Sequence, residues 1–175
     1  MDYFIRPLTQ EDEPFLWQML YEAAHLVEEG NLTVQDAMNN PDLAKYVSNW
    51  GCKDDSGFVA ILESSNQPVG ASWLRLLTGE NKGYGYVDDR TPELAMSTTG
   101  YAYAILPQHI NKGIGTQLLT HLLASAKTSY PSISLSTRAT NPAVGLYKCF
   151  GWEVVGDSEI INRVGGISFK MKINF

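Results

Sequence analysis

The sequence of 175 residues has little of what marks secreted, membrane-spanning or disulfide-bonded proteins. It contains only two cysteines, Cys52 and Cys149, which form no close motif. A disulfide framework is therefore excluded, and we expect both residues to be reduced thiols in a cytoplasmic protein. No apolar run reaches the length that spans a bilayer, and the N-terminus lacks a basic, apolar signal pattern.

Basic clusters and metal-ligand spacings are also missing. The net charge is −6 and no run of Lys and Arg is present, so we expect no nucleic-acid partner. The three histidines, His25, His109 and His121, have no metal-ligand spacing, and we expect no metal site. The length suits one domain over residues 1–175 with a sizeable core.

What is present begins with residues 104–123, which combine a strand end, two glycines and a helical pattern. Apolar residues run to Leu106, and Pro107 ends the strand because proline has no N–H for a ladder. After Gly113 and Gly115, apolar residues recur with helical spacing, as Ile114, Leu118, Leu119, Leu122 and Leu123. Such a helix start has unpaired N–H groups, and glycines there let phosphates approach the backbone. This predicts a site for a phosphorylated cofactor, with an ordinary helix start after a tight turn as the alternative.

Two common phosphate loops do not fit these residues. A P-loop needs Gly-Lys-Ser/Thr at its end, whereas Lys112 precedes Gly113 here. A dinucleotide fold needs a third glycine three residues after Gly115, and that position is Leu118.

A second motif lies between Asn141 and Trp152, where the sequence reads NPAVGLYKCFGW. Together with the glycine loop, it resembles the GNAT acetyltransferase superfamily. The phosphate loop of that family commonly reads Gln/Arg-x-x-Gly-x-Gly/Ala, and its following helix reads Asn-x-x-Ala-x-x-Leu-Tyr-x-x-x-Gly-Phe. The chain matches these patterns at Gly113, Gly115, Asn141, Leu146, Tyr147 and Gly151, with Trp152 as the aromatic. It departs from them at Ile110, where Gln or Arg is usual, and at Asn111, where many members have glycine.

The resemblance implies an α/β (α+β) GNAT fold, a mixed, mostly antiparallel twisted sheet of about six to seven strands flanked by helices. It implies an N-acetyltransferase that passes an acetyl group directly from acetyl-CoA to a primary amine of a small molecule or peptide. The residues themselves lead us to expect no metal and no membrane partner, and the resemblance allows a homodimer.

The resemblance also assigns the cofactor site. The strand end, Ala104, Ile105 and Leu106, would line the pantetheine arm of acetyl-CoA, with a backbone N–H there polarising the thioester carbonyl. Phosphate and arm contacts would come from Asn111, Lys112, Gly113, Ile114, Gly115, Thr116 and Asn141. Lys112 and Asn141 also have plainer interpretations, as a solvated side chain and as a helix cap.

Tyr147 matches the family tyrosine that protonates the leaving thiolate, and its alternative is a half-buried aromatic on an amphipathic helix. Glu93 is the first candidate for the base that takes the amine proton, because a carboxylate at the start of the cofactor strand often does so in the family. Asp88 and Asp89 are the alternatives, and each of the three carboxylates can equally be a solvated surface group. Cys149 lies on a core-like helix face, so we expect no covalent acyl intermediate.

Residues 79–92 are the least regular part of the chain and contain Gly79, Gly83 and Gly85. With Trp73 from the preceding strand, this segment supplies the candidate acceptor residues Trp73, Tyr84, Tyr86 and Asp88. An aromatic, acidic lip would suit an amine. The alternative is a solvated connection.

Apolar periodicity and turn residues place the remaining elements. Strands are expected at 3–6, 58–63, 68–77, 93–106, 132–137, 152–155 and 167–174. Helices are expected to begin near Thr9 or Glu13, at Thr33, at Pro41, after Gly113 and at Asn141, with capping boxes at Thr9–Asp12 and Thr33–Asp36. Residues 93–106 form either one bulged strand or two short ones.

Two other functions stay open. A module that binds acyl-CoA without turnover fits the departures at Ile110 and Asn111, although such a module has no need of Tyr147 as a proton donor. An acyltransferase that uses a longer acyl group also fits, because the sequence does not fix the acyl pocket.

Overall fold

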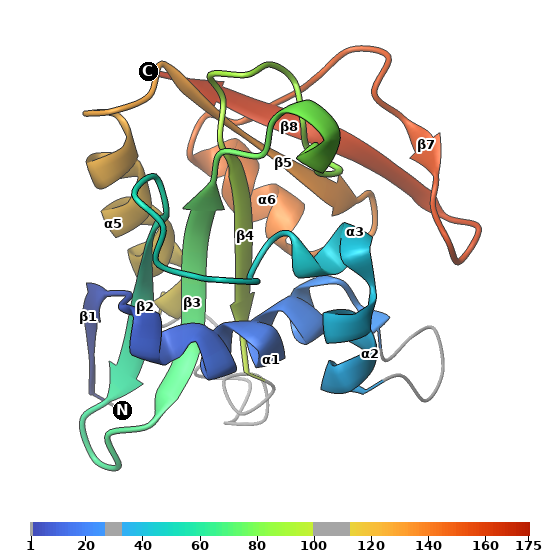
Figure 1. Cartoon of the computed structure of the whole chain (residues 1–175). Coiled ribbons are helices and arrows are strands. Elements are labelled where there is room, and N and C mark those ends of the chain that lie inside the picture. Colours follow the sequence, from blue (N-terminus) through green and yellow to red (C-terminus); the bar gives the residue numbers. More distant parts are fainter. Residues whose placement is uncertain (1, 27–32, 100–112) are drawn as a thin grey trace. The chain divides into compact units, whose positions relative to one another are not determined.

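The computed structural model describes residues 2–26, 33–99 and 113–175 (Figure 1). The chain divides into two compact units: unit 1 is Met1–Arg75 with Ala95–Ser125, and unit 2 is Leu76–Leu94 with Ala126–Phe175. A single domain over 1–175 stays a prediction. Within the described ranges, no helix has both the length and the apolar character needed to cross a bilayer.

Unit 1 is built on a strand meander with helices around it. Its elements are β1 (Tyr3–Pro7), η1 (Gln10–Asp12), α1 (Glu13–Ala23), α2 (Val34–Asn39), α3 (Pro41–Ala44), β2 (Ser56–Leu62), β3 (Pro68–Arg75), the second half of β4 (Glu93–Thr98) and nearly all of α5 (Ile114–Ala126). β2 pairs antiparallel with both β1 and β3, which confirms the predicted hairpin. β4 lies next to β3 in the sheet, and just beyond it the Thr99 N–H donates to the Val69 carbonyl at 2.9 Å.

Because side chains alternate along β3, neighbouring residues of this strand show what covers each face of the meander. Ser72 Oγ donates to the Leu118 carbonyl of α5 at 3.3 Å, whereas its neighbour Trp73 donates from Nε1 to the Tyr46 carbonyl at 2.9 Å. α5 therefore covers one face, and the segment after α3 covers the other. On the α5 face, Ala60, Leu62, Val69 and Leu118 form a buried cluster.

The predicted helix starts are confirmed in unit 1. Both capping boxes are present, and the Thr9 N–H donates to the Asp12 carboxylate at 2.7 Å. Arg6 donates two hydrogen bonds of 2.8 Å each to the same carboxylate. Pro14 and Pro41 occupy the first turns of α1 and α3, where proline loses no helical hydrogen bond.

Unit 2 contains η3 (Gly79–Asn81), the start of β4, β5 (Ser132–Arg138), α6 (Ala143–Cys149), β6 (Glu153–Val154), β7 (Ile160–Ile161) and β8 (Ile167–Asn174). Here β4 runs parallel to β5 at the pair Glu93–Ser134, and β8 pairs antiparallel with β5, β6 and β7. The fold is thus mixed and mostly antiparallel with flanking helices, as predicted. The sequence analysis missed β7, which has only two residues.

Two details correct the sequence analysis. Cys149 is exposed rather than on a core-like face, because it is the last residue of α6 and faces away from the Tyr147 side of that helix. The strand expected over 152–155 is only Glu153–Val154.

Candidate active site

α5 begins immediately after a glycine with left-handed backbone geometry. Gly113 has φ +79°, which favours glycine over any side chain, and its carbonyl accepts from the Gln117 N–H at 2.6 Å. Among the described residues, a Cβ added at Gly113 would meet only the Thr116 Cβ, at 3.8 Å. Gly113 thus precedes the first turn of a thirteen-residue helix, which begins with Ile114, Gly115 and Thr116, and N–H groups without an intrahelical partner in such a turn can bind an anion. The other predicted cofactor residues, Ala104, Ile105, Leu106, Asn111 and Lys112, lie outside the described residues.

Asn141 fixes the turn between β5 and α6. Its Oδ1 accepts from the Ala143 N–H at 2.9 Å, and its Nδ2 donates to Thr137 Oγ1 at 3.1 Å. α6 begins at Ala143, two residues later than expected, and Asn141 satisfies one of its first free N–H groups. Both sides of the amide are occupied, so the cap interpretation has direct support, whereas a contact with the cofactor arm stays a prediction.

Tyr147 is placed on the inner side of α6. It is 6% exposed, and its ring lies 5.7 Å from the ring of Trp152 at an interplanar angle of 51°. The Tyr147 carbonyl accepts from the Trp152 N–H at 3.1 Å, which closes the turn after the helix. The ring is thus packed against Trp152, and the role of the hydroxyl as an acid stays a prediction.

Glu93, the first base candidate, is 2% exposed at the start of β4. Its Oε2 accepts from the Gly83 N–H at 2.9 Å, and its Oε1 accepts from the Gly85 N–H at 2.6 Å. The glycine-rich loop is thus fastened to β4 through this carboxylate.

Further hydrogen bonds and an ion pair hold the same glycine-rich loop at residues 86–91. Lys170 Nζ donates to the Tyr86 carbonyl at 2.6 Å, and Lys172 Nζ lies 3.7 Å from the Asp88 carboxylate. Thr91 donates to Asp88 Oδ1 at 2.8 Å. We define residues 83–91 as the anchored loop. The alternation predicted for β8 places Lys170 and Lys172 on one face of the strand, but it could not predict that they contact this loop.

Two groups of the anchored loop, Asp88 and Tyr86, have perturbed pKa values. The Arg90 N–H donates to Asp88 and lowers the pKa of its carboxyl, and Thr91 and Lys172 act in the same direction. The hydrogen bond to Asp89, at 2.9 Å, raises the pKa of the Tyr86 hydroxyl. Asp88 therefore stays negative at neutral pH, which suits binding of a cation better than removal of a proton.

The two aromatic side chains of the anchored loop differ in exposure, and their role in binding an acceptor stays a prediction. Tyr84 is 39% exposed and Tyr86 is half-buried, with Lys82 Nζ 4.2 Å from the centre of the Tyr86 ring. The structure thus brings Tyr84, Tyr86, Asp88 and Glu93 together in one loop cluster of unit 2.

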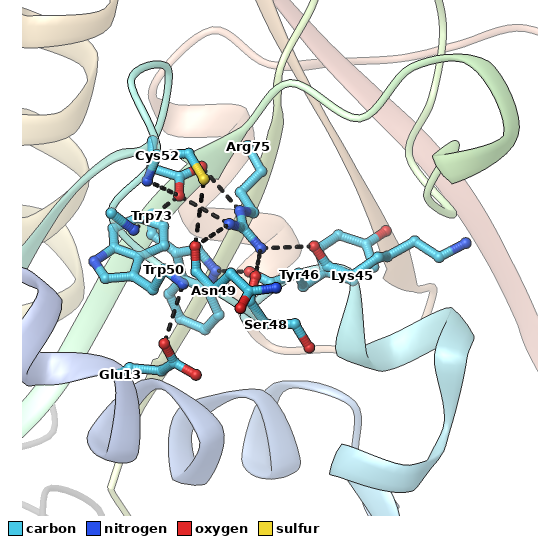
Figure 2. Close-up of polar contacts among 11 residues, drawn as sticks. Glu13, Lys45, Tyr46, Ser48, Asn49, Trp50, Cys52, Trp73 and Arg75 are labelled. Atoms are coloured by element: carbon cyan, nitrogen blue, oxygen red, sulfur yellow. Dashed lines mark hydrogen bonds and ion pairs between the residues drawn. The ribbon is translucent and has the colours of Figure 1, made fainter.

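Trp73 lies in unit 1, where it is 1% exposed and its only N–H donates to the Tyr46 carbonyl (Figure 2). This geometry is that of a side chain packed in the core. Substrate binding by Trp73 stays a prediction without support from its contacts.

Figure 2 also shows a polar network that the sequence analysis missed. Arg75 pairs with Asp55 at 2.8 Å and donates to the backbone carbonyls of Lys45, Ser48 and Asn49. Glu13 adds a bond to the Trp50 N–H, at 3.1 Å. The only signal in the sequence was an arginine at the end of a buried strand. The network holds the irregular residues 45–55 in place.

No group of three or more His, Cys, Asp or Glu side chains with the geometry of a metal site occurs in the part of the chain that the structure describes.

Comparison with known proteins gives one family. The profile of the Acetyltransferase (GNAT) family matches residues 11–152, which span both motifs. A search of curated protein sequences found no match.

Solved structures with the same fold are numerous. A ribosomal-protein-alanine N-acetyltransferase from Brucella melitensis has a TM-score of 0.67 at 20% identity, covering 98% of this chain and 99% of its own. A chimera of the Vibrio cholerae spermidine N-acetyltransferase SpeG and hSSAT has a TM-score of 0.62 at 18% identity, covering 99% and 96%. The aminoglycoside acetyltransferase AAC(6')-Ib, solved with coenzyme A and kanamycin, has a TM-score of 0.57 at 19% identity, covering 99% and 95%. At these identities the likeness shows the fold alone.

Proposed function

Because the chain belongs to the GNAT family of acetyltransferases, we propose that it transfers an acetyl group from acetyl-CoA directly to a primary amine of a small molecule. The observation that carries this proposal is the family match over residues 11–152, which includes both the glycine loop and the tyrosine helix.

The start of α5 supports binding of acetyl-CoA as co-substrate. The left-handed backbone of Gly113 and the first turn of α5 together suit the phosphates of coenzyme A. Ile114, Gly115 and Thr116 would contribute backbone N–H groups. Asn111 and Lys112 would extend this contact, and Ala104, Ile105 and Leu106 would receive the pantetheine arm, as the resemblance implies.

The acceptor is proposed to be an amine that is cationic in solution. The similar structures are named for spermidine, for the alanine of a ribosomal protein and, by its complex, for kanamycin. In this chain the anchored loop presents Tyr84 and Tyr86 beside the negative Asp88. Aromatic faces and carboxylates both attract ammonium groups.

The transfer makes one bond and breaks one. The neutral amine nitrogen attacks the acetyl carbon, the C–N bond forms, and the carbon–sulfur bond breaks to release the thiolate of CoA. Tyr147 gives its phenolic proton to that thiolate. The amine proton goes to a base, with Glu93 as the first candidate and Asp88 and Asp89 as alternatives.

The test is amine-dependent release of free thiol from acetyl-CoA, with a panel of polyamines, aminoglycosides and amino acids. We expect Tyr147→Phe to lower kcat by about 10²-fold or more while the KM for acetyl-CoA stays unchanged, because only the proton donor is lost. Tyr130→Phe, a tyrosine in the turn before β5, is the matched control. Equal kcat in wild type and Tyr147→Phe would remove the acid role of Tyr147. Binding of acetyl-CoA without acetylation of any amine would favour the non-catalytic module.

A further inference from the structure

The Glu93 carboxylate accepts hydrogen bonds from two backbone N–H groups of the anchored loop. Each oxygen accepts one backbone N–H, from Gly83 at 2.9 Å and from Gly85 at 2.6 Å, and the side chain is 2% exposed. Hydrogen bonds donated to a carboxylate stabilise its charged, unprotonated form. Both oxygens already accept backbone N–H groups of the loop, so the carboxylate is a strong anchor for the backbone that it holds.

The loop is shaped to reach this carboxylate. Gly85 is buried, and a Cβ added there would lie 2.8 Å from the backbone carbon of Leu135 and 2.9 Å from Glu93 Oε1. Glycine is therefore required for the loop backbone to enter between β5 and the carboxylate. Gly85 and Glu93, eight positions apart in the sequence, are therefore both needed for this close approach of the loop to the carboxylate.

The far end of the anchored loop has its own attachments. Lys170 holds the Tyr86 carbonyl at 2.6 Å, and Thr91 bonds to Ser132 of β5 at 2.7 Å. Tyr84 and Tyr86 thus lie on a short stretch whose ends are fixed by Glu93 on one side and by β8 and β5 on the other. The backbone on which these rings are mounted is preorganised by these bonds.

From this geometry we infer that Glu93 is a positioning residue, which fixes the anchored loop so that Tyr84 and Tyr86 receive the acceptor amine, and that it does not take the amine proton. The inference deepens the proposed acetyltransferase function and rests on it for the identity of the acceptor. On this inference, another group or a water molecule accepts the amine proton in place of Glu93.

The test compares two variants that disturb the same contact by different means. Glu93→Gln places an amide NH2 where one of the two N–H donors needs an acceptor, and Gly85→Ala pushes the loop away from Glu93 while leaving the carboxylate intact. Glu80→Gln, an exposed residue of η3, removes the same charge without a contact to the loop anchor and is the control. Circular dichroism and a thermal melt establish that each variant is folded.

For a positioning residue, Glu93→Gln and Gly85→Ala have the same effect: the KM for the amine rises about 10- to 100-fold, the KM for acetyl-CoA is unchanged, and the pH profile of kcat keeps its shape. The double variant is then no worse than either single variant. The inference is overturned if Glu93→Gln alone abolishes the acidic limb of the kcat profile while Gly85→Ala retains it, which is the behaviour of a base.

A second readout does not depend on activity. Hydrogen exchange of the Gly83 and Gly85 amides in the wild-type protein is expected to be slow, and to become fast in Glu93→Gln but not in Glu80→Gln. Fast exchange in the wild type would overturn the anchor even if the protein acetylates amines. Slow exchange together with no transfer to any amine would leave the anchor standing and would count against the proposed function alone.

Discussion

Replacing Arg75 should remove much of the stability of unit 1, because its guanidinium group donates to several half-buried partners at once (Figure 2). Nε and Nη2 donate to Asp55 at 2.9 and 2.8 Å, and Nη1 donates to the carbonyls of Lys45 and Ser48 at 3.0 and 2.8 Å. Nη2 also reaches the Asn49 carbonyl, at 3.1 Å. The side chains of Arg75 and Asp55 are only 11% and 7% exposed.

The magnitude follows from what remains after the change. Arg75→Met keeps most of the side-chain volume but leaves a buried carboxylate without its cation, which typically costs about 3–5 kcal/mol. The Gly51 and Cys52 N–H groups still donate to Asp55, both at 3.0 Å, so we expect the lower end, about 3 kcal/mol. That is a large share of a total stability of about 5–15 kcal/mol.

Urea unfolding followed by circular dichroism measures this loss as a lower midpoint with an unchanged slope. Lys45→Met is the matched control, because its ion pair with Asp42 is a surface contact on a carboxylate that is 66% exposed, and such pairs contribute about 0–1 kcal/mol. Arg75→Lys should fall between the two, since lysine keeps the charge but not the fork of donors. A loss below about 1 kcal/mol for Arg75→Met would refute the view that this network holds residues 45–55.

Two further predictions concern local stability. Burial raises the pKa of Asp12, but the hydrogen bonds from Arg6 and Thr9 outweigh it and the pKa lies below its usual value. The carboxylate therefore stabilises the fold fully above the unfolded pKa of about 3.9, and this stabilisation is lost as the pH falls through the lower folded pKa. The urea midpoint of Asp12→Asn should consequently vary less between about pH 5 and pH 2 than the urea midpoint of the wild type. Gly151 has φ +89° and Gly145 lies within α6 with open space at its Cα, so Gly151→Ala should destabilise by about 1 kcal/mol and Gly145→Ala should stabilise by roughly 0.5–1 kcal/mol in the same assay. Equal effects of the two alanines would contradict these assignments.

Local patterns were enough to predict most elements of the fold. The alternation from Ile167 to Asn174 and the caps at Thr9 and Thr33 depend on residues within a few positions of one another, and the structure confirms them. β7 was missed because two residues give no periodicity. The left-handed geometry of Gly113 fits the turn predicted before the helix, and phosphate binding by this turn stays a prediction.

The surroundings of the candidate site could not be predicted in the same way, because they depend on contacts between distant segments. Nothing near Glu93 in the sequence shows that Gly83 and Gly85 donate to it, and nothing near Tyr86 shows that Lys170 holds its carbonyl. Trp73 was a substrate candidate because it is aromatic, and only its buried N–H bond to Tyr46 indicates packing.

The most direct test of the proposed function is calorimetric titration of the protein with acetyl-CoA, with desulfo-CoA as a comparison ligand. Gly113→Val forces a branched side chain into the left-handed turn before α5, and Gly165→Val introduces the same strain at the same φ of +79° in the β7–β8 turn. We predict that wild type and Gly165→Val bind both ligands and that Gly113→Val binds neither. No binding of either ligand to the wild type, or equal binding by Gly113→Val, would contradict the assignment of this turn as the coenzyme A site.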